Sequence, residues 1–247
     1  MPSVATIVKE PFGLPSLEEG LVNERKLVGP AFLAPRAIAW LTSSTVPDSC
    51  FPEGKLHSIY FDSPNLDSYG EKINGDNLKM KVRLRWYETD APDDAEVPCY
   101  LEMKLRIGAA RRKARVKLSA RSGWLRHTPL MDASFGRFLA AHAPELPHPI
   151  PHHWVPSICV TYRRRRFFCP RTETRVAVDW DIHADRGNSL LLPAVGPVRL
   201  DCSLCEFKNE GGGAPPWLEG LFEAGYRLRA HSKYASLIEL ASRGLPF

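Results

Sequence analysis

The sequence predicts an α+β protein with one antiparallel sheet of eight strands, large enough to curl or to close into a barrel. Short runs of alternating apolar and polar residues recur along the chain between turn residues, and this period of two is typical of strands. Helical patterns interrupt the runs in only a few places. A sheet of this size has enough strands to close on itself. The expected strands cover residues 22–28, 56–62, 79–87, 98–105, 113–118, 157–168, 174–182 and 200–208.

Composition narrows the class of protein. The 247 residues are 44% hydrophobic and 25% charged, which is ordinary for a globular chain and excludes a collagen-like, disulfide-dense or disordered one. No stretch reaches the roughly 20 apolar residues of a membrane helix, and the N-terminus lacks the apolar core of a signal peptide. We therefore expect a soluble, cytoplasmic protein with one domain over residues 1–247 and a core over about 22–240.

Four segments carry helical signals. Proline opens the segment 35–43, where a missing amide is harmless in a first helical turn, and Asp132 precedes apolar residues at helical spacing over 132–142. A third helix is expected over 215–224, which opens on two prolines. Ser232 is a good N-cap for a last helix that runs through Leu240.

The six cysteines are expected to be reduced thiols, because nothing in the sequence indicates secretion and the chain is long enough to form a core without disulfides. Cys202 and Cys205 form the one CxxC motif. A strand would place the two side chains on opposite faces, which argues against a zinc site.

The clearest pattern in the sequence is an alternation of cations with apolar residues. In the run 79–86, every odd position is Lys or Arg and every even position is apolar, so a strand would carry all four cations on one face. One such strand is more simply explained as half-buried with its polar face in water. The pattern recurs, however, at Lys113, Arg115 and Lys117, and in the run 163–166 parity sends Arg163 and Arg165 outward and Arg164 inward.

Acidic residues lie beside these cations at strand spacing. Three Glu-x-Lys pairs each aim an acid and a base at the same side of a strand: Glu24 with Lys26, Glu102 with Lys104, and Glu206 with Lys208. Cations that face one another across a sheet repel unless an anion lies between them, so we infer an anionic ligand. The carboxylates suit a hard divalent ion that accompanies phosphates.

Nucleic acid is the other class of anion that the sequence allows. Aromatic residues near the basic runs, such as Trp86 and Phe167, could stack on bases. The interspersed glutamates would weaken binding to a nucleic-acid backbone, whereas in a metal–phosphate site they would hold the cation. We therefore expect a short linear polyphosphate compound and no nucleic acid.

Three further carboxylates have simpler interpretations. Asp62, in the segment YFDSP, is expected to bond its own backbone in a turn rather than to act as a base. Asp179 and Asp181 flank Trp180, and each fits equally well as an inward carboxylate near Arg175 or as part of a strand-end salt bridge.

The motifs together resemble a known family, the VTC (vacuolar transporter chaperone) domain of polyphosphate polymerases, in the triphosphate tunnel metalloenzyme (CYTH-like) superfamily. The order and spacing of the motifs, from about residue 22 to 240, carry the resemblance. They are SIYFDSPNLDSYGEKINGDNLKMKVRLRWY at 58–87, LEMK at 101–104, TYRRRRF at 161–167, RVAVD at 175–179, CEFK at 205–208 and HSKY at 231–234. The resemblance implies an antiparallel eight-stranded tunnel surrounded by helices.

The resemblance also implies a reaction, the transfer of the γ-phosphoryl group of ATP to a growing polyphosphate chain with Mn²⁺ or Mg²⁺. Glu206 would bind the metal, with Glu24 and Glu102 as helpers. Lys81 joins the implied phosphate contacts because it shares a strand face with Arg83. The catalytic cations would be Arg83, Arg85, Lys104, Lys208 and Lys233, and the other phosphate contacts Lys26, Arg164 and Arg175.

Two alternatives to a polymerase stay open. A metal-dependent triphosphatase would use the same residues and admit water in place of the acceptor phosphate, and a non-catalytic module would only bind polyphosphate or nucleotide. The superfamily typically opens with Glu-x-Glu-x-Lys, but Val22 occupies the first position here, and this resembles the polymerase branch more than the triphosphatase and cyclase branches.

Overall fold

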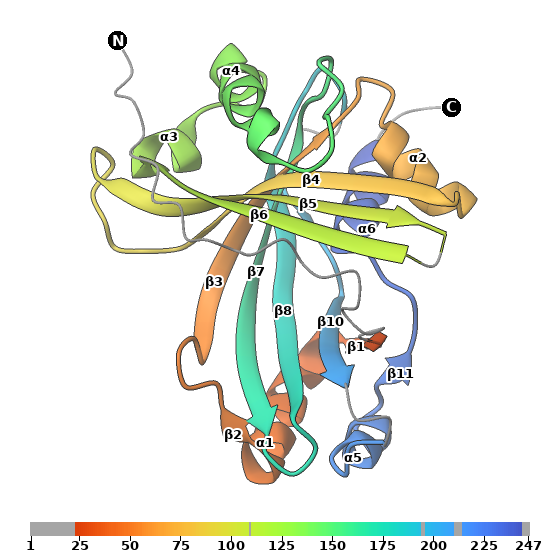
Figure 1. Ribbon diagram of the computed structural model, residues 1–247. Helices are drawn as coiled ribbons and strands as arrows, with labels where there is room; N and C mark the ends of the chain where they lie inside the picture. Colours follow the sequence, from red (N-terminus) through yellow and green to blue (C-terminus); the bar gives the residue numbers. More distant parts are fainter. Residues whose placement is uncertain (1–22, 109, 194–195, 210–213, 244–247) are drawn as a thin grey trace.

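One antiparallel sheet organises the computed structural model (Figure 1), which describes residues 23–108, 110–193, 196–209 and 214–243. Val22 and the N-terminal segment, where no signal peptide was expected, lie outside the described residues. The long strands are β1 (Asn23–Pro30), β3 (Glu53–Asp62), β4 (Leu78–Tyr87), β5 (Glu96–Ile107), β6 (Ala110–Arg121), β7 (Val155–Cys169), β8 (Thr174–Gly187) and β10 (Cys202–Asn209). The two-residue strands are β2 (Val46–Pro47), β9 (Val198–Arg199) and β11 (Arg227–Leu228).

Every expected strand forms, but the prediction of a closed eight-stranded barrel is wrong. The described residues form eleven strands, and the sheet is open, in the order β11-β1-β10-β8-β7-β3-β4-β5-β6, with β2 paired to β7 and β9 to β8. The added strands are two residues long, too short to show a period of two. The edge strand β6 is lined with exposed cations such as Arg112 and Lys113, and charged edge strands resist further pairing.

The sheet is strongly curled, so that β4, β5 and β6 cross in front of β7 and β8 (Figure 1). Much of its outer face is apolar and packs against helices. On β4, Val82 and Leu84 join one core cluster with residues of α3 (Ser122–His127) and α4 (Ala133–His142). A second cluster joins Val178 and Phe207 to α1 (Ala34–Ser44) and α5 (Leu218–Glu223).

Helix α6 (Lys233–Ser242) covers part of the opposite side of the sheet, which we call the inner face. Its Tyr234 and Ile238 pack in one cluster with Tyr60 and Tyr162. The side chain of Ser232 caps the helix by accepting a hydrogen bond from the backbone of Ala235. Part of the inner face is therefore apolar and covered by α6, whereas the cations and carboxylates described below lie on another part.

Asp62 fixes α6 to the sheet. Its carboxylate accepts hydrogen bonds from the backbone amides of Ser68 (2.8 Å) and Tyr69 (3.1 Å), in the first turn of α2 (Asp67–Asn74), and from the hydroxyl of Tyr234. Burial raises the pKa of this carboxyl. The prediction that Asp62 binds nearby backbone is confirmed, and the bond to Tyr234 adds a long-range role.

The four predicted helices form as α1, α4, α5 and α6, although α5 begins at Leu218 rather than at the prolines before it. Other helices in the described residues were not predicted, because they are short or lack an apolar stripe. Helix α2 is almost wholly polar, with Ile73 exposed, and α3 has six residues. The remaining ones are the 3-10 turns η1 (Ala31–Leu33) and η2 (Ala143–Glu145).

The cysteines of the CxxC motif lie on opposite faces, as predicted. Cys205 is buried in the outer cluster with Phe207, whereas Cys202 packs against the cluster that contains α6. Each of the six cysteines is a free thiol. In the part of the chain that the structure describes, no helix combines the length and apolar character that crossing a bilayer requires.

Candidate functional site

The inner face carries the cations that the alternation of β4 predicted. Arg83 donates through Nε to Glu102 (2.7 Å), and Lys81 donates through Nζ to the hydroxyl of Ser232 (3.0 Å). The intervening Val82 and Leu84 are fully buried on the outer side. The predicted face of β4 is therefore confirmed.

Glu102 gathers three arginines into what we call the Glu102 cluster. Register places Glu102 directly between Arg83 of β4 and Arg115 of β6, and Arg85 also reaches its carboxylate, at 3.5 Å. The side chain of Glu102 is 10% exposed. Burial opposes its ionisation, but the charges of Arg83, Arg85 and Arg115 outweigh that effect and hold the pKa of Glu102 well below its usual range.

Two tyrosines extend this cluster. Arg83 donates to the hydroxyl of Tyr60 (2.9 Å), and Arg85 donates to the hydroxyl of Tyr162 (3.1 Å) and to Ser58 (3.1 Å). Burial of Tyr60 disfavours its phenolate, yet the charges of Arg83 and Arg85 are stronger and lower the pKa of Tyr60 to about 7. The hydroxyl of Tyr60 therefore titrates in the physiological range.

A second group, which we call the Glu206 cluster, lies on the other half of the inner face. It consists of Glu206, Asp179, Arg164, Lys233 and Lys26. Arg164 donates to both Asp179 (2.6 Å) and Glu206 (2.8 Å), and Lys233 lies 3.0 Å from Glu206 and also pairs with Asp179. Lys26 lies 3.3 Å from Glu206 across the β1–β10 ladder.

Opposite charges in the Glu206 cluster keep Glu206 and Lys233 ionised. Burial opposes the charge of Glu206, but Lys233, Arg164, Lys26 and Lys104 together hold its pKa well below the usual range. Burial likewise opposes the charge of Lys233, and the carboxylates nearby more than compensate, so its pKa is raised. The cluster is a network of paired charges rather than a set of loose side chains.

The curl of the sheet brings the two clusters together. The charge of Lys104, on β5, helps to lower the pKa of Glu206, on β10, although several strands separate β5 from β10 in the sheet order. The ring of Tyr162 lies between the clusters, with Lys233 4.9 Å and Arg164 5.4 Å from its centre. The clusters therefore form one site on the inner face.

Most of the residues singled out in the sequence belong to this site, and three others are exposed. Lys104 is exposed, as are Arg175 and Lys208, which face each other on β8 and β10. Glu24 lies opposite Lys208 in β1, but its side chain is outside the described part of the structure. The residues inside the site are Lys26, Lys81, Arg83, Arg85, Glu102, Arg164, Glu206 and Lys233.

The site also contains residues that were missed or left open. Asp179 is fully buried against Arg164 and Lys233, whereas Asp181 pairs with Arg199. Alternation with Val176 and Val178 would have placed Asp179 inward, but its partner follows only from the pairing of β7 with β8. The same holds for Arg115, Tyr60 and Tyr162, whose roles depend on strand register.

The carboxylates differ in their suitability for a metal ion. The described residues contain no group of three His, Cys, Asp or Glu side chains placed to hold one. Cations engage both oxygens of all three carboxylates: arginines contact Glu102 and Asp179, and Lys26, Lys233 and Arg164 contact Glu206. Glu206 differs in being the most exposed of the three, at 18%. Mg²⁺ at phosphate sites commonly needs one or two carboxylates, with phosphate oxygens and water as its other ligands. Glu206 fits that requirement.

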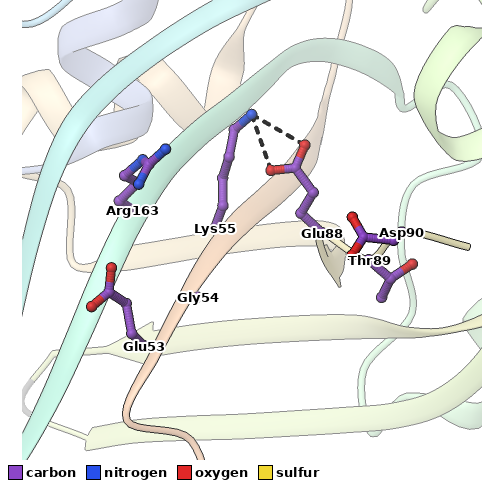
Figure 2. Close-up of a pocket in the computed structure, with 7 residues that line it drawn as sticks. All are labelled: Glu53, Gly54, Lys55, Glu88, Thr89, Asp90 and Arg163. Atoms are coloured by element: carbon purple, nitrogen blue, oxygen red, sulfur yellow. Dashed lines mark hydrogen bonds and ion pairs between the residues drawn. The ribbon is translucent and has the colours of Figure 1, made fainter.

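A pocket of about 330 Å³ lies on the outer face, away from the site (Figure 2). Lys55 and Glu88 form an ion pair in it, and Arg163 lines its wall. Arg165 also points outward, toward Glu53. The predicted outward direction of Arg163 and Arg165 is confirmed, and these cations do not belong to the inner site.

Comparison with known proteins assigns the family. The fold and site define an α+β protein with paired cations and carboxylates on the inner face of a curled sheet. A model of the VTC domain matches residues 50–241, so the chain belongs to the VTC domain family. The comparison with curated proteins finds no match. The family and the cationic inner face together support a function that involves phosphates or nucleotides.

Solved structures of similar fold include two proteins named as candidate adenylate cyclases. The one from Vibrio parahaemolyticus has a TM-score of 0.46 and 10% identity, and the match covers 87% of this chain and 97% of that chain. The one from Bacillus halodurans has a TM-score of 0.48 and 12% identity, with 85% and 93% covered. At this similarity neither supports an argument about function.

The pKa of Tyr60 gives a direct test of the electrostatics of the site. We expect one tyrosine of the folded protein to ionise near pH 7, seen as phenolate absorbance, and Tyr60→Phe to remove that transition. Tripolyphosphate should move it to higher pH, because a bound anion offsets the charges of Arg83 and Arg85. Tyrosine ionisation that begins only near the ordinary pKa of about 10 would contradict this effect of Arg83 and Arg85 on Tyr60.

Proposed function

We propose that the protein is a polyphosphate polymerase that transfers the γ-phosphoryl group of ATP to inorganic polyphosphate. The observation that carries this proposal is the convergence of cations from opposite halves of one sheet onto the inner face. Arg83 and Arg85 come from β4, whereas Arg164 and Lys233 come from β7 and α6. Phosphoryl transfer needs mainly alignment and neutralisation of charge on the phosphoryl oxygens, and such a surface supplies both.

The cations differ in the contacts they can offer. The planar guanidinium groups of Arg83, Arg85 and Arg164 suit paired phosphate oxygens, whereas Lys26 and Lys233 act as point charges. Each charge pair at about 4 Å contributes about 4 kcal/mol at an effective dielectric of 20, so several together can offset the loss of phosphate hydration. Exposed Lys104, Arg175 and Lys208 would contact the chain at the margin of the site.

The proposed reaction joins two phosphate compounds. A terminal oxygen of the polyphosphate acceptor attacks the γ-phosphorus of ATP, a new P–O bond forms there, and the bond to the β-phosphate oxygen breaks, so that ADP leaves. The pKa values of Glu102 and Glu206 are low, so both stay ionised. We infer that they hold the cations in place until phosphate oxygens take over those contacts.

The proposed metal is Mn²⁺ or Mg²⁺, held by Glu206 with Glu24 and Glu102 as helpers. When bound, the ion would neutralise phosphate charge and orient the nucleotide. Cations contact the oxygens of both Glu102 and Glu206, and Glu206 is the more suitable ligand because its side chain is more exposed, 18% against 10%. The cytoplasm, where ATP is present, stays the location predicted from the sequence.

One assay separates the proposed polymerase from its alternatives. The protein is incubated with ATP and Mn²⁺, and the products are resolved on a gel that distinguishes long-chain polyphosphate from free phosphate. Long chains support a polymerase. Free phosphate alone would indicate a triphosphatase, and unchanged ATP a binding module, so either result would overturn the proposal.

The cations should contribute unequally to synthesis. We expect Arg83→Ala and Lys233→Ala to lower the rate by roughly 30- to 1,000-fold, since both side chains are held inside the site and losing one preorganised stabilising group costs about 2–4 kcal/mol. Arg112→Ala should change it little, because Arg112 is exposed and alternates with the inward cations of β6. Circular dichroism checks that each variant is folded. Comparable losses in all three would mean that general basicity drives the activity.

The metal assignment has a separate test. Glu206→Gln should lose most turnover and its dependence on Mn²⁺ concentration while ATP still binds, because Arg83 and Arg85 hold phosphates independently of the metal. Glu53→Gln is a matched control that removes an exposed carboxylate from the outer face. Normal manganese dependence in Glu206→Gln would assign the metal to other residues.

A further inference from the structure

Aromatic side chains continue the inner face beyond the two charged clusters. Tyr87 lies four residues after Arg83 on β4, and strand alternation points both side chains to the same face. Tyr100, two residues before Glu102 on β5, points inward for the same reason. Phe51, in the loop between β2 and β3, lies against Tyr87, with 6.3 Å between the ring centres and 18° between the ring planes. We call Phe51, Tyr87 and Tyr100 the aromatic group.

The loop that carries Phe51 is fixed to β7. The carboxylate of Asp48 accepts hydrogen bonds from the backbone amides of Cys50 (3.1 Å) and Phe51 (2.8 Å). The guanidinium of Arg166 donates to the carbonyl of Phe51 (3.1 Å), and its backbone amide donates to the carbonyl of Pro52 (2.7 Å). Phe51 is nevertheless 64% exposed. An apolar ring is therefore held in a fixed place with most of its surface open.

Two arginines connect the aromatic group to the charged clusters. The guanidinium of Arg115 lies 4.4 Å from the centre of the Tyr100 ring and also pairs with the carboxylate of the Glu102 cluster. Arg166 donates to the hydroxyl of Tyr87 (3.2 Å), and its guanidinium lies 5.7 Å from the centre of that ring. On β7, Arg166 follows the arginine of the Glu206 cluster by two residues, so the two share the inner face. The aromatic group is therefore continuous with both clusters.

The neighbours of Phe51 distinguish it from an ordinary exposed residue. A single apolar side chain on a protein surface, such as the exposed Phe32, needs no special explanation. Phe51 instead lies beside two further rings and a guanidinium group, on the face where the cations gather. Aromatic rings and guanidinium planes are the groups on which nucleobases stack in proteins. The aromatic group therefore has the chemistry of a base-binding surface.

The spacing along β4 suits a nucleoside triphosphate. At about 3.4 Å per residue, Tyr87 lies about 7 Å from Arg85 and about 14 Å from Arg83 along the strand. An extended nucleoside triphosphate places its three phosphates at increasing distances from its base over a comparable range. A base on the aromatic group would therefore leave the first phosphate near Arg85 and the last near Arg83.

We propose that the aromatic group binds the base of a nucleoside triphosphate by stacking, while the charged clusters bind its phosphates. This inference rests on the proposed function, because it assigns a place to the nucleoside of the phosphoryl donor. Stacking uses the π-face that every base has, so ATP and GTP should bind with similar affinity. Tripolyphosphate has no base and gains nothing from the aromatic group.

Substitutions of Phe51 test the proposal, because this exposed ring can be removed without opening the core. Phe51→Ala removes the ring, and Phe51→Trp replaces it with a larger one. Phe32→Ala is the matched control, since Phe32 is 77% exposed and lies in η1 next to Leu33, which packs against the outer cluster. Binding of ATP, GTP and tripolyphosphate is measured by titration calorimetry at fixed ionic strength in excess EDTA, and the ATP is checked to be intact afterwards. Thermal unfolding checks that each variant is folded.

Phe51→Ala should bind ATP and GTP about 10-fold more weakly, which corresponds to about 1.4 kcal/mol and lies within the range for stacking of one base on an aromatic ring. Its affinity for tripolyphosphate should change by less than about 2-fold, because the lost ring stacks on bases and carries no charge. Phe32→Ala should resemble the parent protein with all three ligands.

Fluorescence of Phe51→Trp supplies a second readout. The indole ring can stack on a base as the phenyl ring does, so this variant should bind ATP at least as tightly as the parent. The emission that the added indole contributes, taken as the difference from the parent, should be quenched by ATP and by GTP. Tripolyphosphate should leave that emission unchanged, because it brings no ring to the indole.

Several results would overturn the proposal. Unchanged ATP affinity in Phe51→Ala would show that the base lies elsewhere, and an equal loss for tripolyphosphate would show that the loop acts on the phosphate site instead. A parent protein that binds tripolyphosphate but not ATP would also overturn it. A single-stranded oligonucleotide that binds more tightly than ATP, and weakens in Phe51→Ala, would indicate a nucleic-acid surface. ATP binding that depends on Phe51 without synthesis of polyphosphate would count against the polymerase and not against the base site.

Discussion

The structure depends on balancing the positive charge of a buried set of lysines and arginines. Strand alternation forces lysines and arginines of several strands onto one side of the sheet, and the curl then turns that side inward. Glu102, Asp179 and Glu206 lie between these cations and pair with them. A buried charge without a partner would cost several kcal/mol, so the carboxylates are a condition of folding as well as parts of the site. In the proposed function, phosphate oxygens share or replace these contacts.

The open sheet positions the site as a closed one would, because its curl turns the cations of several strands toward a common inner face. Helix α6 covers the apolar part of the inner face, and Asp62 ties its first turn to α2 through Tyr234. That anchor brings Lys233, the first residue of α6, to Asp179 and Glu206. At the other margin, β6 is an edge, so the cations of the β5–β6 hairpin stay accessible. A polyanion could therefore extend from the buried clusters to the surface.

Sequence reasoning found the strands and the direction of their side chains because alternation is a local property. It placed Arg83, Arg164 and Glu206 inward from parity, and the resemblance added Lys233. It could not find that Glu102 neutralises three arginines or that Asp179 holds Lys233, since both depend on register between strands far apart in the chain. Closure of the barrel was expected from the number of strands. The sheet instead stays open, with the cationic strand β6 at one edge, and the two-residue strands bring the number to eleven in the described residues.

The central claim, that Glu102 substitutes for a phosphate ligand, is tested most directly by the stability of Glu102→Gln. Without ligand, its free energy of unfolding should fall by about 3–5 kcal/mol, because buried Arg83 and Arg85 lose their counterion. Tripolyphosphate should then stabilise this variant more than it stabilises the parent. Glu53→Gln, which removes an exposed partner of Arg165, should change stability by less than about 1 kcal/mol. Unchanged stability of Glu102→Gln without ligand, or equal stabilisation of variant and parent by tripolyphosphate, would contradict the account.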